Sequence, residues 1–101
     1  MPIFQTAHYQ VKPEAVGRVK TAIDQFVAYV RDNEPDTRMY VVWQSIDDPT
    51  SFVHLVEFAD QAAQDRHGQS ESVRKFESIY MPELVGGPVR FTDYQQIATN
   101  R

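Results

Sequence analysis

The alternation of apolar and polar residues divides the first third of the chain into a strand and a helix. Residues 3–11 alternate with a period of two, which predicts a strand. From Val16 to Val30, apolar residues recur at helical spacing, and Pro13 stands where a first helical turn favours proline. The sequence therefore predicts a long amphipathic helix that ends at "NEPDT", because proline disfavours a helical conformation in the residue before it.

The middle and last thirds predict three more strands and an interrupted helix. "RMYVVWQSI" and "FVHLVEF" are rich in β-branched and aromatic residues and flank the turn "DDPTS", which predicts a hairpin. A helix begins after Asp60, a favourable N-cap, and is interrupted at Gly68. A second segment starts at Ser70 or Ser72, and "VRFTDYQQIA" is the last predicted strand. Gly86 and Gly87 precede a proline and are interpreted as a turn.

The element order is therefore β-α-β-β-α-β within a single domain, residues 1–101. This order is typical of an α+β, ferredoxin-like antiparallel sheet with two helices on one face. Both alternating sets of residues in the two hairpin strands are largely apolar, although two helices cover only one face. We therefore expect a homodimer in which two sheets pack face to face; the alternative is that the second face carries only scattered apolar residues.

Charge and composition narrow the classes of partner. The net charge of −4 argues against nucleic acid and anionic membranes as partners. The chain has no cysteine, no secretory signal and no apolar run near the roughly 20 residues that span a bilayer, so we expect a soluble cytoplasmic protein. We expect no metal site, because the histidines lack a local cluster of further ligands and the HExxH pattern is absent.

A family resemblance follows from motifs spread over nearly the whole chain. These are "YQVKPE", "RMYVVWQSIDDP" leading into "SFVHLVEFAD", the histidine of "AAQDRH", "SVRKF" and "PVRFTDY". Their order and spacing resemble the antibiotic-biosynthesis-monooxygenase-like proteins, which form dimeric α+β barrels. The resemblance implies a homodimer, a pocket between the sheet and the helices, and, in several members, oxygenation of phenols, quinols or polyketide aromatics without a cofactor.

The haem-degrading branch of these proteins provides a comparison within the family. Its members carry an asparagine, a tryptophan and a histidine iron ligand at positions that align here with Ala7, Phe58 and Phe76. None of the three residues matches, and phenylalanine cannot ligate iron. The resemblance therefore implies that haem is not a ligand of this protein, and we expect no cofactor.

The candidate site combines two histidines with an aromatic pocket. A cofactor-free oxygenase needs a base and a dry pocket, and histidine titrates nearest neutral pH. If Ala7 and Phe58 face the helices, strand parity places Tyr9 and His54 there too. We take His54 and His67 as candidate catalytic bases. The expected substrate-binding residues are Tyr40 or Trp43, depending on the hairpin register, together with Phe58, Phe76 and Tyr80.

Each histidine also has a structural interpretation. His67 could bond the carbonyl groups freed where the helix breaks, and His54 could be a satisfied sheet histidine. Two functions follow. The first is a cofactor-independent monooxygenase of small aromatic or quinol-type substrates. The second is a non-catalytic, dimeric small-ligand-binding or accessory domain of the same fold.

Overall fold

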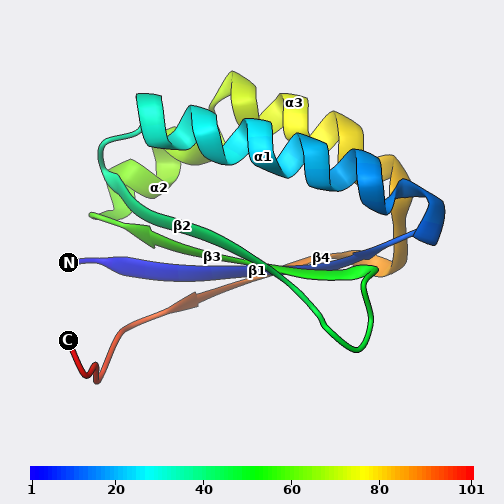
Figure 1. Ribbon diagram of the computed structural model, residues 1–101. Coiled ribbons are helices and arrows are strands. Elements are labelled where there is room, and N and C mark those ends of the chain that lie inside the picture. Colours follow the sequence, from blue (N-terminus) through cyan, green and yellow to red (C-terminus); the bar gives the residue numbers. More distant parts are fainter.

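The computed structural model describes residues 1–101 and contains one antiparallel sheet covered on one face by helices (Figure 1). The elements are β1 (Ile3–Val11), α1 (Val16–Asn33), β2 (Thr37–Gln44), β3 (Ser51–Phe58), α2 (Gln61–Gly68), α3 (Glu71–Tyr80) and β4 (Leu84–Tyr94). Short 3₁₀ turns, Pro13–Ala15 and Met81–Glu83, precede α1 and follow α3. The predicted α+β, ferredoxin-like fold is confirmed, with the second helical region divided into α2 and α3.

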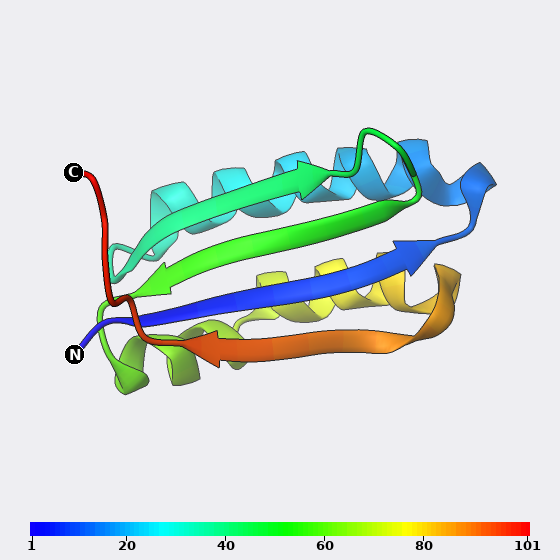
Figure 2. The same cartoon turned by 90° about the horizontal axis from the view of Figure 1, so that it is seen from below.

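The strand order in the sheet is β2-β3-β1-β4, and every neighbouring pair is antiparallel. Figure 2 views the sheet from the side without helices, where all four strands lie in front and the helices lie behind them. The core lies between the sheet and the helices. It is formed by apolar side chains of β1, α1, β3 and α3, with Val11, Val19 and Phe58 among the most deeply buried.

The break between α2 and α3 is a short connection with a cap on each side. The Asp60 side chain accepts a hydrogen bond from the Ala63 amide at the start of α2, and Ser70 accepts one from Val73 at the start of α3. Both are typical N-caps. Gly68 ends α2, as expected, but its φ is not positive, so the turn does not depend on the special conformational freedom of glycine.

The last strand differs from its prediction. It begins at Leu84, and Gly86 and Gly87 lie inside it with φ of 76° and 111°, at an irregularity in the pairing with β1 between His8 and Gln10. The interpretation of this pair as a turn outside the sheet was wrong. Glycine tolerates positive φ, so it suits a β-bulge, and β4 is an edge strand, where Pro88 removes no necessary hydrogen bond.

None of the helices combines the length and apolar character needed to cross a bilayer.

Candidate functional site

His54 lies at the centre of the helix-facing side of the sheet, between two tyrosine hydroxyls. Its Nε2 is 2.7 Å from the hydroxyl of Tyr9 on β1, and its Nδ1 is 2.7 Å from the hydroxyl of Tyr40 on β2. Strand alternation explains the arrangement, because Tyr9, His54 and Tyr40 come from adjacent strands and point to the same face. The side chain of His54 is fully buried, and both of its ring nitrogens are occupied.

Burial fixes the charge state of this trio. Desolvation lowers the pKa of His54 to about 3, with a smaller contribution from the nearby His67. Desolvation also raises the pKa of Tyr9 and of Tyr40 well above the usual tyrosine value. All three rings are therefore neutral near pH 7. A neutral imidazole donates from one nitrogen and accepts at the other, so the two hydroxyls have opposite roles toward His54.

A second histidine is held by a carboxylate at the edge of the same interior. His67, in the last turn of α2, places Nδ1 2.7 Å from Oε1 of Glu34, the residue that caps the C-terminus of α1. The Thr37 hydroxyl donates to the same oxygen at 2.9 Å. Both side chains are largely buried, with exposures of 12% for His67 and 14% for Glu34.

This geometry assigns the roles of the two nitrogens of His67. An ionised carboxylate only accepts hydrogen bonds, so Nδ1 carries a proton in this pair. The ring makes its hydrogen bond through Nδ1, so Nε2 is the nitrogen that can accept a proton. The expectation that the ring of His67 bonds helix-end carbonyls was wrong, because its partner is the Glu34 side chain.

Aromatic rings connect the two histidines. The rings of Phe26 and Phe76 stack with their centroids 5.1 Å apart and their planes 6° apart. Phe26 also contacts His67, and Phe76 contacts His54, each at a centroid separation of 5.6 Å. Each histidine therefore lies against one member of a stacked phenylalanine pair.

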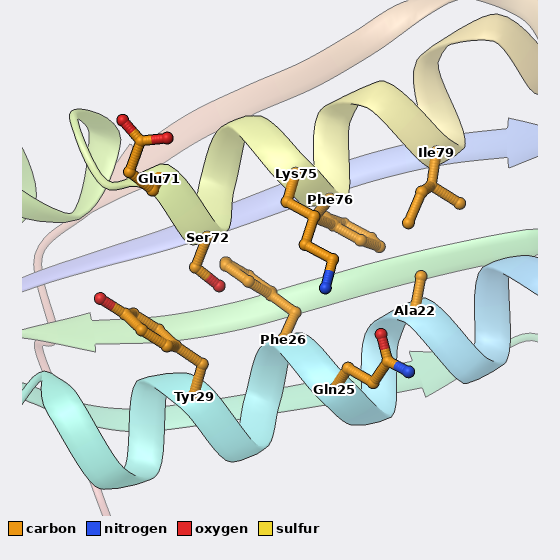
Figure 3. A pocket seen from close by; sticks show the side chains of 9 residues that line it. All are labelled: Ala22, Gln25, Phe26, Tyr29, Glu71, Ser72, Lys75, Phe76 and Ile79. Atoms are coloured by element: carbon orange, nitrogen blue, oxygen red, sulfur yellow. The ribbon is translucent and has the colours of Figure 1, made fainter.

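The same pair forms the floor of a groove between α1 and α3, shown from close by in Figure 3. The groove has a volume of about 360 Å³. Its lining consists of Ala22, Gln25, Phe26 and Tyr29 from α1 and Glu71, Ser72, Lys75, Phe76 and Ile79 from α3. An open, mostly apolar groove with a few polar groups is the usual form of a small-molecule site.

Most of the candidate residues predicted from sequence come together in the structure. His54, His67 and Tyr40 lie in the helix-facing interior, with ring contacts between each histidine and Tyr40. The apolar residues Phe58, Phe76 and Tyr80 are buried in the same layer, and Tyr80 has its pKa raised to about 12 by burial. This interior is filled by side chains, and the groove opens between the two helices instead.

Trp43 lies elsewhere. The register pairs Val42 with His54 and Trp43 with Val53, so Tyr40 faces the helices and Trp43 faces the uncovered side of the sheet. The alternative in which Trp43 lines the interior was therefore wrong, and 59% of its surface is exposed.

Sequence reasoning missed the hydrogen-bond partners of both histidines and every residue that lines the groove except Phe76. Tyr9 was placed on the correct face by strand parity, but its hydrogen bond to His54 depends on long-range pairing. Glu34 lies in "NEPD", which has the composition of a solvated turn, and no signal in the sequence marks it as the partner of His67. No group of three or more histidine, aspartate or glutamate side chains is arranged to hold a metal ion.

Comparisons with known proteins agree with this architecture. A family model described as antibiotic biosynthesis monooxygenase matches residues 2–78. A solved structure described as an antibiotic biosynthesis monooxygenase has a TM-score of 0.87 at 23% identity, covering 95% of this chain and 99% of that one. A structure from Mycobacterium tuberculosis has a TM-score of 0.87 at 20% identity, with both chains covered completely. A conserved protein from Methanosarcina mazei has a TM-score of 0.86 at 22% identity, covering 96% and 94%. A search of curated proteins found no significant match.

Proposed function

The chain belongs to the antibiotic biosynthesis monooxygenase family, and on this premise we propose that it is a cofactor-independent monooxygenase of small aromatic or quinol-type substrates. The substrate binds in the groove between α1 and α3. The observation that carries the proposal is the floor of this groove, a stacked pair of phenylalanines with a histidine against each ring. An aromatic substrate can pack against this floor, since aromatic rings attract each other in edge-to-face as well as offset-stacked arrangements.

The reaction draws its electrons from the substrate. A quinol loses a hydroxyl proton to a base, and the resulting anion transfers electrons to O₂. One oxygen atom replaces a ring hydrogen and the other leaves as water, so that a quinol and O₂ give a hydroxyquinone and water. The four electrons that reduce O₂ all come from the quinol. The chain must therefore supply a base and a site with little water.

His67 is the base in this proposal. Its Nδ1 is held by Glu34, which leaves Nε2 as the acceptor and stabilises the imidazolium that forms. Phe26 contacts His67 and also lines the groove, so the proposal requires the Phe26 ring to turn aside before a substrate in the groove can reach Nε2. His54 is less suited to accept a proton, because burial lowers its pKa to about 3. We assign His54 to holding the rings of Tyr9 and Tyr40 in place.

Oxygen uptake with a panel of hydroquinones tests the proposal. The wild-type protein should consume O₂ without added metal or flavin, and His67→Gln and Glu34→Gln should both lower kcat, with His67→Gln the more severe. His8→Gln is the matched control, because His8 lies on the other face of the sheet. Full activity in folded His67→Gln would remove the proposed base, and no uptake with any quinol would remove the oxygenase.

The second function, ligand binding without turnover, is supported by a specific observation. Both ring nitrogens of His54 are occupied, and neither histidine lines the groove. An aromatic ligand that shifts the NMR signals of Ala22 and Ile79, in a protein that consumes no O₂, would assign the protein to this function.

We also propose that two copies pair through the uncovered sheet face. The residues exposed there are Val41 and Trp43 on β2 and Tyr94 on β4. Phe4, on β1, lies beside Tyr94. An apolar sheet face of this kind is typical of an interface between copies of one chain. Sedimentation at micromolar concentration should give a dimer, and Trp43→Glu should shift it toward monomer. A wild-type monomer under these conditions would contradict the pairing.

A further inference from the structure

We infer that Lys75 makes the groove between α1 and α3 selective for aromatic ligands that carry a negative charge, such as an aromatic carboxylate or a phenolate. The inference rests on the proposed function in one respect, that the groove binds an aromatic ring. It adds the charge of the ligand and names the residue that recognises this charge.

The side chain of Lys75 extends into the groove. In Figure 3 it extends from α3 in front of Phe76, and its ammonium group is directed toward α1, in the direction of Gln25 and Ala22. A ring that packs against the phenylalanine floor would therefore have the ammonium group beside it. Ring substituents lie at that edge, so the position suits an anionic substituent on the ligand.

The charge of Lys75 is free to bind a ligand. Its ammonium group takes part in none of the ion pairs of the chain, which involve five other basic residues. The only other charged side chain of the lining is Glu71, one helical turn earlier on α3. Figure 3 shows the carboxylate of Glu71 pointing away from the groove. The groove itself therefore has a positive end over an apolar floor.

This arrangement is useful for the proposed chemistry. A quinol must become an anion before it can give an electron to O₂, and a nearby ammonium group favours the anionic form of a phenol. Lys75 would thus lower the pKa of the bound hydroxyl, while His67 receives the proton. In this scheme Lys75 is a specificity-determining residue, and the proton acceptor is a separate group on another helix.

A pair of isosteric probes tests the charge preference directly. 2-Naphthoate and 2-naphthamide have the same ring system and differ in charge, and neither is a quinol, so their binding does not depend on turnover. Their dissociation constants are measured by NMR titration at low salt, with the signals of Ala22 and Ile79 reporting occupancy of the groove. The wild-type protein should bind the naphthoate about twofold to fivefold more tightly than the naphthamide, as expected for a solvent-exposed charge pair.

Variants on the same face of α3 isolate the contribution of Lys75. Lys75→Met should abolish the preference for the naphthoate over the naphthamide, and Lys75→Arg should keep it. Glu71→Gln is the control for a change of charge on the same helix and should also keep it. Added salt should reduce the preference in the wild-type protein, because the charges are exposed to solvent.

Three results would overturn the inference. Equal affinity of the wild-type protein for both probes, or a preference that survives in Lys75→Met, would refute the role of Lys75 and leave aromatic binding in the groove intact. If neither probe shifts the signals of Ala22 and Ile79, the groove does not bind aromatic rings, and the substrate site of the proposed function falls as well. If the wild-type protein consumes no O₂ with any quinol but still prefers the naphthoate, the oxygenase is refuted and this inference is supported.

Discussion

Replacing His54 with glutamine should make the stability of the fold less sensitive to acid. In the folded protein, burial lowers the pKa of His54 from 6.5 to about 3. The unfolded chain therefore binds a proton near pH 6.5 that the folded protein does not accept until about pH 3. The stabilisation associated with a neutral His54 is complete above pH 6.5 and is lost progressively as the pH falls toward 3.

The size of the effect follows from the width of this window. Each pH unit between the two pKa values costs about 1.4 kcal/mol of unfolding free energy. Between pH 7 and pH 4.5, the His54 contribution is therefore a loss of about 3 kcal/mol. That is a large part of the 5–15 kcal/mol, roughly, by which domains of this kind are stable. Glutamine suits the comparison because its amide, like a neutral imidazole, can donate to one tyrosine hydroxyl and accept from the other, and it does not titrate.

Urea unfolding followed by circular dichroism at a series of pH values measures the difference. The free energy of unfolding of the wild-type protein should fall by about 3 kcal/mol more than that of His54→Gln between pH 7 and pH 4.5. His8→Gln, which removes a histidine from the other sheet face, is the comparison for loss of a histidine outside the cluster of His54 with its two tyrosines. Parallel curves for wild type and His54→Gln would refute the argument, because they would mean that His54 titrates alike in the folded and unfolded states.

Three further predictions concern single contacts, each measured as the change in unfolding free energy at pH 7.5. Tyr40→Phe should cost about 1–3 kcal/mol, because it leaves a buried nitrogen of His54 without its partner at 2.7 Å; an unchanged urea midpoint would contradict this. Gly86→Ala should destabilise the protein, since Gly86 has a φ of 76°. Gly68→Ala should be neutral or stabilising by up to about 1 kcal/mol, because nothing lies within 4 Å of the added methyl group. A Gly68→Ala protein less stable than Gly86→Ala would contradict this. Asp60→Ala should cost about 1 kcal/mol through loss of the N-cap of α2, and a loss below about 0.3 kcal/mol would mean that the cap is not formed in solution.

The sequence predicts most of the fold because its signals are local. A period of two or of 3.6 residues indicates each element, and strand parity correctly placed Tyr9 on the face of Ala7 and His54 on the face of Phe58, all four of which are buried. The register of the hairpin is a different kind of information. It depends on how the loop between Gln44 and Ser51 closes, so the choice between Tyr40 and Trp43 stayed open until the strand pairing was known.

The missed features depend on distances between residues far apart in the chain. Glu34 and His67 are separated by 33 positions and meet only because α2 folds back against the end of α1. The hydrogen bonds of Tyr9 and Tyr40 with His54 join three strands, and the low pKa of this histidine results from its burial there. The sequence pattern around a histidine in a strand does not show whether the folded protein makes this histidine a base or a neutral structural group.

The bulge in β4 determines which changes in chain length this strand can accept. Leu84 pairs with Val11, and Arg90 pairs with His8, so four residues of β4 lie opposite the single residue Tyr9. The three additional residues reverse the alternation of β4 relative to β1. Deleting all three would leave a regular strand in which Arg90 still lies opposite His8, whereas deleting one or two would leave a shorter bulge. We therefore expect natural shortening of β4 at Gly86–Gly87 that keeps the pairing of Arg90 with His8 to remove three residues.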